Sequence, residues 1–276
     1  MRILLTGHHG YVGSVVGPAL ADAGHDVVGL DAFLYEGCDL LPGRPPAREL
    51  RRDVRDVTVS ELEGFDAVVH LAALSNDPLG DLDAALTREI NYRATVRLAK
   101  AAREAGVERF VFASSCSMYG AAGADALVDE TAPLAPLTEY AASKVEAEVA
   151  LLSLADARFA PTSLRFATAY GVSPRLRLDV VLNNLAGWAL TTGRVRLLSD
   201  GTAWRPLVHV EDMAAAILAV LDSSAETGRG RPFNVGAPDA NVQIRALAEI
   251  VAGAVPGASV EIAEGAEPDK RSYRVD

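Results

Sequence analysis

A tyrosine and a lysine four residues apart, Tyr140 and Lys144, form the sharpest chemical pattern in the sequence. They lie in residues 137–156, whose pattern predicts a helix, and positions i and i+4 of a helix share a face. The phenol and the ammonium can therefore point at one reacting centre, where the positive charge lowers the pKa of the phenol. Such a pair is common on protein surfaces. It predicts acid–base chemistry only if the rest of the chain supplies a ligand.

The first residues of the chain predict a site for a phosphate-bearing ligand. The apolar run at residues 3–5 is typical of a short buried parallel strand, and a helical pattern covers residues 12–23. The turn between them has the spacing G-x-x-G-x-x-G. Glycine lets the backbone approach a pyrophosphate, which amide groups and the positive end of the helix dipole stabilise. The predicted cradle consists of Gly7, Gly10, Tyr11, Val12 and Gly13.

An acidic residue at the end of the second predicted strand narrows the kind of nucleotide that the site is expected to bind. Residues 26–31 read as an apolar strand that ends in Asp31, about 20 residues after the glycine turn. A carboxylate at this place accepts hydrogen bonds from the adenosine ribose hydroxyls, and it repels a 2′-phosphate. Asp31 therefore favours NAD over NADP, unless it merely opens the loop that follows the strand.

Composition excludes several other classes of protein. The 276 residues are half hydrophobic, yet no apolar run approaches the roughly 20 residues that span a bilayer, and no N-terminal signal pattern is visible. The net charge of −11 argues against a nucleic-acid partner. Two cysteines, Cys38 and Cys116, are too few and too far apart to predict a zinc site or a disulfide framework. We expect a cytoplasmic protein without a metal or a membrane partner.

Alternating strand and helix patterns predict an α/β fold with a Rossmann-type, doubly wound parallel sheet. We expect a nucleotide-binding domain over residues 1–168 and a smaller substrate-binding lobe over residues 169–276, partly interleaved with the sheet. The predicted strands are 3–5, 26–31, a third ending within 51–56, 65–71, 107–113, 162–167, 195–198, 206–210 and 232–235, and the predicted helices are 12–23, 81–105, 137–156, 179–192, 211–222 and 242–254.

The order of these motifs resembles the extended short-chain dehydrogenase/reductases, specifically their nucleotide-sugar epimerase/dehydratase branch. The resemblance covers essentially the whole chain. Within this branch, the chain is similar to UDP-glucose 4-epimerase-like proteins. It implies a nicotinamide cofactor and a nucleotide-sugar substrate. The motifs that carry it are the glycine turn, Asp31, Asp53-Val54, His70-Leu71-Ala72-Ala73, Asn91, the run from Phe112 to Gly120, Tyr140/Lys144 and the run from Arg205 to Asp212.

The resemblance assigns roles to further residues on the cofactor side. Asp53 and Val54 are expected to contact the adenine, and residues 71–73, at the end of a strand, to line the pyrophosphate. Asn91 matches an asparagine that supports the active site from the following helix. The predicted NAD site therefore comprises Gly7, Gly10, Tyr11, Val12, Gly13, Asp31, Asp53, Val54, Leu71, Ala72, Ala73, Asn91, Tyr140 and Lys144.

On the substrate side, the resemblance places Ser115 beside Tyr140, where its hydroxyl binds the sugar oxygen that becomes a carbonyl. Together with Tyr140 and Lys144 it completes the predicted catalytic group. His209 is expected to be structural. The residues expected to bind the nucleotide sugar are Ser75, Asn76, Ser115, Ser117, Asn183, Asn184, Arg205, Arg271 and Arg274.

Departures from the family pattern narrow the chemistry. Sugar 4,6-dehydratases carry an Asp-Glu pair where this chain has Cys116 and Ser117, so that reaction is not expected. Cys116 is expected to be a small buried residue, because relatives that use a thiol for 3,5-epimerisation have it one place later. Ala167 replaces a common asparagine, and Ser75-Asn76-Asp77 are expected to provide polar contacts instead. No Arg-x-Gly-Asp occurs, which leaves the diphosphate to Arg205, Lys270, Arg271 or Arg274.

Three functions remain open on this basis. The first is an NAD-dependent nucleotide-sugar epimerase, most simply at C4, in which Tyr140 moves the hydroxyl proton and NAD carries the hydride. The second is a nucleotide-sugar 4-ketoreductase or dehydrogenase with an exchangeable cofactor. The third, which the intact Ser115, Tyr140 and Lys144 disfavour, is a non-catalytic NAD-binding protein. The resemblance also implies a homodimer formed through the helices at 81–105 and 137–156.

Overall fold

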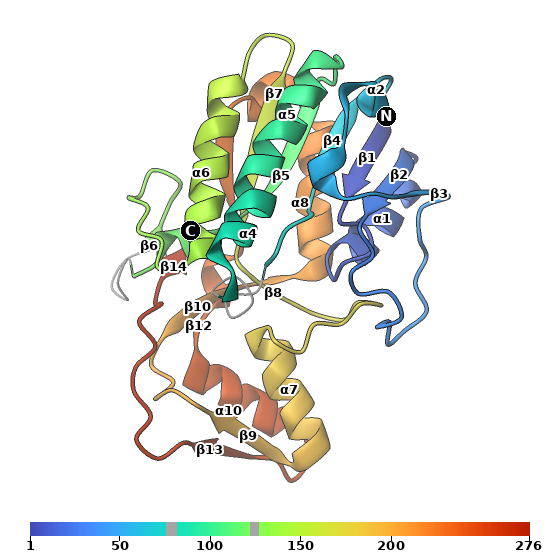
Figure 1. Ribbon diagram of the computed structural model, residues 1–276. Helices are drawn as coiled ribbons and strands as arrows, with labels where there is room; N and C mark the ends of the chain where they lie inside the picture. The colour runs from blue at the N-terminus through green and yellow to red at the C-terminus, as the bar shows by residue number, and fades with distance from the viewer. Residues whose placement is uncertain (76–81, 122–126) are drawn as a thin grey trace.

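A seven-stranded, fully parallel sheet forms the centre of the molecule (Figure 1). The computed structural model describes residues 1–75, 82–121 and 127–276. Short, buried apolar segments form the inner strands, as expected for a sheet covered on both faces. In spatial order the strands are β11 (Arg231–Val235), β7 (Ala160–Phe166), β5 (Arg109–Ser115), β4 (Ala67–His70), β1 (Arg2–Thr6), β2 (Asp26–Asp31) and β3 (Arg48–Arg51).

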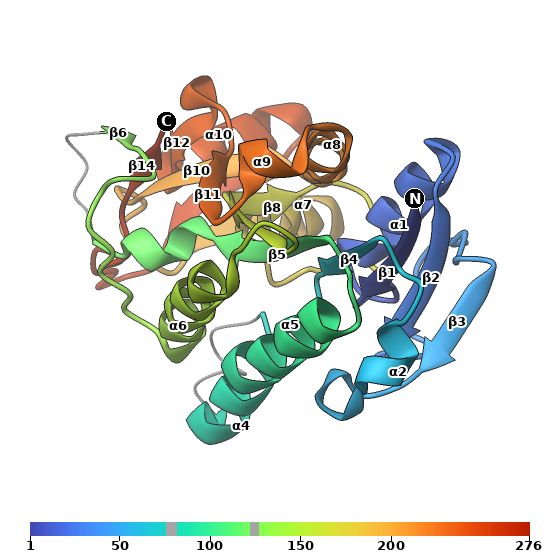
Figure 2. The same ribbon diagram turned by 90° about the horizontal axis from the view of Figure 1, so that it is seen from above.

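Helices cover both faces of this sheet (Figure 2). On one face, α1 (Gly13–Asp22) packs beside α8 (Val210–Asp222). On the other face the helical segments are α2 (Val59–Leu62), α4 (Ala84–Arg88), η2 (Glu89–Ala94, a π-helical stretch), α5 (Thr95–Glu104) and α6 (Glu139–Leu154). The doubly wound fold is therefore confirmed.

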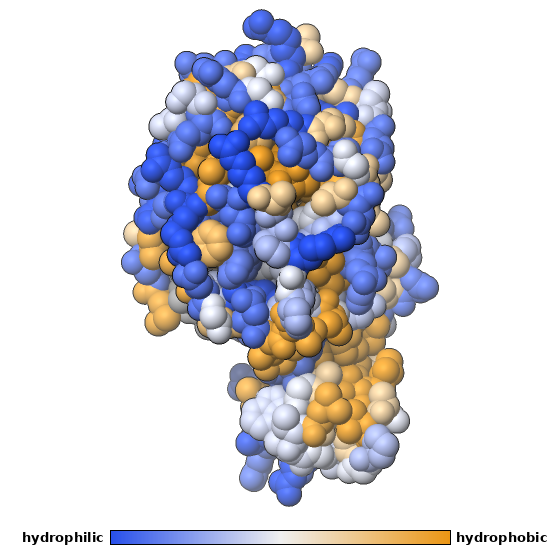
Figure 3. All heavy atoms as spheres, turned by 90° about the vertical axis from the view of Figure 1, so that its right-hand side faces the viewer, coloured by the Kyte–Doolittle hydropathy of each residue, from blue (hydrophilic) through white to orange (hydrophobic). Residues whose placement is uncertain are grey.

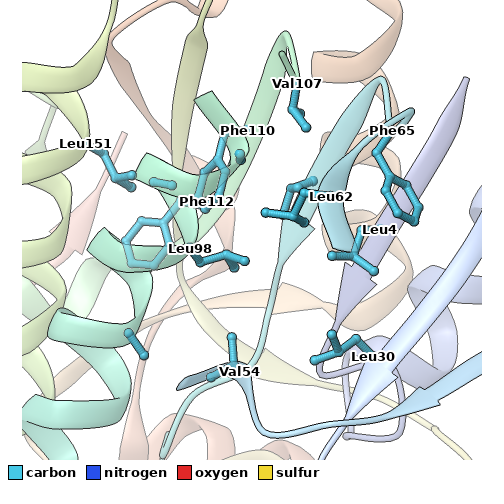
Figure 4. Packing of buried hydrophobic residues seen from close by; sticks show 14 of the residues in the cluster. Leu4, Leu30, Val54, Leu62, Phe65, Leu98, Val107, Phe110, Phe112 and Leu151 are labelled. Carbon is cyan, nitrogen blue, oxygen red and sulfur yellow. The ribbon is translucent and has the colours of Figure 1, made fainter. Parts of the chain in front are cut away.

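Each face of the sheet has its own apolar core. On one side, Phe110 and Phe112 of the sheet lie close to Leu98 and Leu151 of the helices, and Leu4 belongs to the same cluster (Figure 4). Alternate strand residues, such as Ile3 and Leu5, pack on the other side against α1 and α8. Burial of apolar surface contributes about 25 cal/mol per Å². The two cores hold the strand ends that carry the site in fixed positions.

A smaller body lies below the main sheet in Figure 1. It has a separate apolar core formed by α7 (Val181–Thr192), α10 (Ile244–Ala254) and two paired strands, β9 (Arg194–Leu197) and β13 (Ser259–Ile262). The chain returns from it to the main sheet, since α8 and β11 belong to the larger body. Apolar atoms gather at the narrowing between the two bodies (Figure 3).

Short elements connect the two bodies and complete the described chain. A three-stranded sheet joins β12 (Asn241–Gln243), β10 (Trp204–His209) and β8 (Thr168–Tyr170), and β6 (Leu127–Val128) pairs with β14 (Arg274–Val275). The remaining short helices are η1 (Val54–Asp56), η3 (Cys116–Tyr119), α9 (Ala225–Gly228) and η4 (Pro238–Ala240).

Two predicted elements differ from the structure. The third strand was expected to end within residues 51–56. In the structure it covers residues 48–51, and the residues after 51 are not part of it. There the Asp53 side chain accepts a hydrogen bond from the Arg55 amide at 2.9 Å, which turns the chain into η1. The helix predicted over 81–105 is interrupted by the π-helical stretch η2, which changes the direction of the side chains that follow.

The strand order places a functional site at the carboxyl end of the sheet. From β1 the chain moves outwards to β2 and β3, and then crosses to β4 on the opposite side of β1. Loops after β1 and β4 therefore diverge and leave a crevice between them. Ligands of open α/β sheets bind at such a switch point.

Candidate active site

Two adjoining cavities open at this edge of the sheet. The first, of about 760 Å³, lies over the turn after β1 and is called the nucleotide cavity below. The second, of about 1110 Å³, lies between the main sheet and the smaller body and is called the substrate cavity. The two share Tyr11, Val12, Leu71, Ala73, Ser75, Arg177 and Asp179, so they adjoin each other along these residues.

Close backbone packing explains the glycines of the turn. Gly7 has φ +74°, and a Cβ there would lie 2.7 Å from the Ala72 nitrogen; at Gly13 it would lie 2.1 Å from the Gly7 carbonyl oxygen. Any side chain at either position would push β1, α1 and the loop after β4 apart. The turn therefore presents bare backbone at the start of α1, which fits a dinucleotide pyrophosphate. Gly10, Tyr11 and Val12 line the same cavity.

Asp31 lies at the lip of the nucleotide cavity, at the end of β2. Its carboxylate accepts hydrogen bonds from the amides of His9 at 3.0 Å and Phe33 at 2.8 Å. These bonds fix the carboxylate beside the glycine turn, where a ribose hydroxyl would donate to it. Asp53 and Val54 line the same cavity, and the hydrogen bond from the Arg55 side chain lowers the pKa of the Asp53 carboxyl.

The loop after β4 forms the opposite wall of the nucleotide cavity. Leu71, Ala72 and Ala73 line it as predicted. Asn91 lines neither cavity; from η2 its side chain accepts from the Leu74 amide at 2.8 Å and donates to the Leu74 carbonyl at 2.9 Å. Asn91 therefore holds the loop in place and is not positioned as a direct cofactor contact.

Tyr140 and Lys144 project from α6 into the substrate cavity. The Lys144 Nζ lies 5.8 Å from the centre of the Tyr140 ring and donates a hydrogen bond to the Ala113 carbonyl at 2.7 Å. Burial lowers the pKa of Lys144 to about 7. The ammonium is therefore easily deprotonated near neutral pH, and its position is fixed by the end of β5.

Ser115 ends β5 and faces the same cavity together with Ser117. The Ser115 hydroxyl donates to that of Ser117 at 2.9 Å, and the Ser117 amide donates to the Ser115 hydroxyl at 3.2 Å. Cys116 between them points the other way: it is buried, and its thiol donates to the Arg165 carbonyl at 3.0 Å. Burial raises the pKa of that thiol, so Cys116 is the small buried residue that was expected.

Two arginines and one carboxylate lie at the far end of the substrate cavity. Arg205 donates to Asp269 at 2.7 Å and also to the Arg271 carbonyl, while Arg271 donates to Asp269 at 3.0 Å. Burial raises the pKa of Asp269, but the hydrogen bonds from Arg271 and the charge of Arg205 outweigh this and lower it. A dianionic ligand group would meet both guanidinium groups here.

The remaining predicted substrate residues divide into three groups. Ser75 and Asn184 line the substrate cavity. Asn183 does not: it donates to the Tyr11 hydroxyl at 3.3 Å and the Arg177 carbonyl at 3.0 Å, because one helical position turns it away from its neighbour. Arg274 stacks over Trp204 at 5.1 Å and lies outside the cavity lining. Asn76 lies outside the described residues.

Comparison with known protein families matches residues 3–236 to the model described as the NAD dependent epimerase/dehydratase family. The match spans most of the chain and both walls of the site. The chain belongs to this family. It is consequently an NAD-dependent enzyme of the nucleotide-sugar epimerase and oxidoreductase group, with the Rossmann fold that the sequence predicted, and its predicted cofactor is confirmed.

Individual relatives support the assignment. The chain is 34% identical to a UDP-glucose 4-epimerase of Corynebacterium glutamicum, over 87% of this chain and 76% of that protein. It is 33% identical to a dTDP-glucose 4,6-dehydratase of Streptomyces griseus, over 100% of this chain and 85% of that protein. Among solved structures, MoeE5 in complex with UDP-glucuronic acid and NAD is 30% identical, with a TM-score of 0.86 over 100% of this chain and 90% of the other.

The structure adds site residues of this family member that sequence analysis missed. Arg175 lines the nucleotide cavity, and Arg177 and Asp179 lie where the two cavities join. Arg177 donates to the Ser75 hydroxyl at 2.8 Å and to Asp179 at 2.6 Å. The alternation of charged and apolar residues from 175 to 179, directly after a strand and a Gly-x-x-Pro turn, is the pattern that could have identified them.

The described residues contain neither a metal-binding cluster nor a membrane-spanning helix. In residues 1–75, 82–121 and 127–276, no three His, Cys, Asp or Glu side chains group in a way that would hold a metal ion. Within the same ranges, no helix is both long enough and apolar enough to cross a bilayer.

Proposed function

We propose that this enzyme interconverts nucleotide sugars that differ in configuration at C4, through a 4-keto sugar. One observation carries the proposal: the cavity over the glycine cradle adjoins the cavity that Tyr140, Lys144 and Ser115 face, and the acid–base group beside Lys144 is the Tyr140 phenol. Epimerisation at C4 needs one such group, because the hydroxyl proton returns to the oxygen from which it came.

The lining argues against reactions that need a second acid or base. The described residues around the substrate cavity include no glutamate, histidine or thiol, and the two aspartates, Asp179 and Asp269, are paired with arginines. Elimination of water across C5 and C6 requires an additional proton donor and acceptor. The Cys116 thiol cannot supply either role, since it is buried against the Arg165 carbonyl. The relationship to 4,6-dehydratases is therefore one of fold and cofactor.

NAD, when bound over the glycine turn, would supply a reversible hydride acceptor. The chain's own residues then control the oxygen at C4. Ser115 donates a hydrogen bond to it, and the phenolate of Tyr140 takes its proton; the phenol so formed later returns that proton. Lys144, fixed by the Ala113 carbonyl, stabilises the phenolate by its charge.

The sugar must turn over between removal and return of the hydride, so the nucleotide end has to hold the substrate. Arg205 and Arg271 provide two cations for a diphosphate, with Asp269 keeping them in place in its absence. A guanidinium binds phosphate oxygens in a bidentate manner. The keto sugar can then rotate while its nucleotide remains anchored.

Incubation of the purified enzyme with a panel of nucleotide sugars, in ordinary and in deuterated water, tests the proposal. We expect a C4 epimer without deuterium on carbon and without net formation of NADH, measured by mass spectrometry and absorbance. UDP-glucose is the first substrate to use, because relatives are named for it.

Each alternative gives a different result in the same experiment. A loss of water with deuterium at C5 would indicate a dehydratase, and deuterium without loss of water would indicate epimerisation next to the carbonyl. Stoichiometric NADH, or reduction of a 4-keto nucleotide sugar by added NADH or NADPH, would indicate a dehydrogenase or ketoreductase. Any of these outcomes would refute C4 epimerisation.

A further inference from the structure

The segment Gly171–Arg177, which follows β8, crosses directly over the glycine turn. The Gly171 carbonyl accepts a hydrogen bond from the Tyr11 hydroxyl at 2.9 Å. The Ser173 hydroxyl donates to the Tyr11 carbonyl at 2.7 Å and lies 2.8 Å from the Ser14 hydroxyl. These residues are about 160 positions apart in the chain. The 171–177 segment therefore belongs to the cofactor site as much as to the smaller body.

The same segment also contacts the long loop that precedes β3. The Leu40 amide donates to the Pro174 carbonyl at 2.9 Å, and Arg175 forms an ion pair with Asp39 at 3.0 Å. The segment thus contacts both the glycine turn and the loop that precedes β3.

Arg175 is the unusual residue of this segment, since it is only 5% exposed. One terminal nitrogen lies 2.9 Å from Nδ1 of His9, inside the glycine turn. The other two guanidinium nitrogens, Nε and Nη1, have no hydrogen-bond partner among the described residues. Leaving a buried charged donor unpaired is costly, so an unpaired guanidinium that lines a cavity is a candidate ligand-binding group.

The charges around the nucleotide cavity identify the ligand group. Its described lining includes three arginines, of which Arg52 pairs with Glu61 and Arg177 with Asp179. Arg175 has a carboxylate on one side only, and lies beside the turn whose glycines make room for a pyrophosphate. A pyrophosphate carries two negative charges and accepts several hydrogen bonds, so its chemistry matches that of a guanidinium with unpaired donors.

We propose that Arg175 binds the pyrophosphate of NAD, and that the 171–177 segment closes over the cofactor so that it stays bound between turnovers. The 171–177 segment then determines the residence time of NAD, whereas the glycine turn determines where it binds. The proposal concerns the cofactor alone and holds whichever sugar carbon reacts.

Equilibrium binding to protein stripped of nucleotide tests the role of Arg175 without any sugar. We expect Arg175→Met to weaken NAD and ADP-ribose by about 10- to 100-fold, the range for charge-assisted hydrogen bonds, and to raise the rate of NAD dissociation. Binding of AMP, which lacks the pyrophosphate, should change much less. Arg175→Lys should give intermediate values, because it keeps the charge and loses the fork of donors.

Two matched variants separate a ligand from a structural ion pair. Asp39→Asn removes the competing carboxylate, so NAD should bind as tightly as before or more tightly. Arg44→Met removes an exposed arginine of the same loop, paired with Asp22, and should leave NAD affinity unchanged. A fall in NAD affinity that is equal for Arg175→Met and Asp39→Asn would overturn the proposal.

Other outcomes also decide the matter. If Arg175→Met leaves NAD affinity and dissociation rate as they are, Arg175 is not a cofactor ligand. If it weakens NADP while NAD is unaffected, the arginine faces the ribose and not the pyrophosphate. Should Arg175→Met fail to fold, Arg175→Lys and Asp39→Asn still give opposite expectations, and equal losses would contradict them.

Discussion

At the scale of single residues, Lys144 is a functional side chain whose burial destabilises the folded protein. Its ammonium is buried beside the Phe112 ring and donates to one carbonyl, and burial lowers its pKa to about 7. An ordinary lysine stays charged far above neutral pH. Placing this amine beside Tyr140 therefore lowers the stability of the folded protein.

We predict that Lys144→Met raises stability while it abolishes turnover. The pKa of Lys144 is depressed on folding, so the unfolded chain binds an extra proton between about pH 7 and the ordinary lysine pKa. The penalty is fully present at pH 7 and below, and disappears as the pH rises towards 10. At pH 7, the free energy of unfolding of nucleotide-free Lys144→Met should exceed that of wild type by up to a few kcal/mol, and its melting temperature should be higher. A lower melting point at pH 7 would contradict this.

Tyr140→Phe should keep NAD bound and lower kcat by at least about 100-fold, because only the proton-transferring oxygen is removed. The measurement is turnover with a nucleotide sugar, alongside the NAD content of the purified protein. Cys116→Ala is the matched control: its thiol faces away from the cavity, so kcat should stay within a factor of a few. Unchanged kcat in Tyr140→Phe would remove the phenol from its assigned role.

At the scale of elements, a chain of hydrogen bonds joins β1, β4 and η2 behind the nucleotide cavity. Thr6 lies 2.7 Å from Nδ1 of His70, and Nε2 of His70 lies 2.8 Å from the Thr95 hydroxyl. Since Thr95 donates to the Asn91 carbonyl, His70 must donate from Nε2 and accept at Nδ1. Burial, together with the charge of Lys144, lowers the pKa of His70 to about 3 and keeps the ring neutral.

This neutral ring predicts acid sensitivity. The unfolded chain protonates His70 near pH 6.5 and the folded chain only near pH 3, so the stability contributed by His70 is complete above pH 6.5 and is lost as the pH falls towards 3. His70→Gln should have a lower free energy of unfolding than wild type at pH 7. Between pH 7 and pH 4, however, its free energy of unfolding should fall less than that of wild type. Denaturant unfolding at several pH values measures the difference. Parallel pH curves would show that His70 does not contribute.

Asn91→Ala should loosen the loop after β4. Two buried hydrogen bonds to Leu74 are lost, which costs about 2 to 4 kcal/mol of unfolding free energy. NAD affinity should fall as well, because that loop forms one wall of the cavity. Melting and NAD binding measure the two effects. Asn91→Asp, which retains an acceptor, should lie between wild type and alanine; a stable variant with normal NAD affinity would contradict the supporting role.

Local patterns predicted those parts of the site that depend on local geometry. The glycine turn, Asp31 and the Tyr140/Lys144 pair follow from the spacing of residues along one strand or helix. The contacts of Arg175 and Asn183 with the glycine turn join residues about 170 positions apart; the alternation at 175–179 can mark Arg175 as a site residue, but it does not show which turn the arginine contacts. The choice between Asn183 and Asn184 depends on the rotation of α7 about its axis, which tertiary packing sets.

At the scale of the whole molecule, the homodimer remains a prediction. Val149 and Leu152, three residues apart on α6, are 63% and 56% exposed, and they lie on one of the helices expected to pair. Glutamate at both positions should convert a dimer into a monomer in sedimentation, whereas Leu190→Glu, on exposed α7, should not. A wild-type protein that sediments as a monomer would refute the prediction.

The position of β11 has a consequence for synthesis. This strand forms one edge of the sheet, beside β7, yet its residues come after α7 and β9 of the smaller body. As the chain emerges from the ribosome, β7 is complete about 65 residues before its neighbour exists, and every residue of β7 is buried in the finished protein. An unpaired apolar edge is prone to aggregate. Nascent chains that stop between these two strands should therefore depend on chaperones, and full release should relieve that dependence.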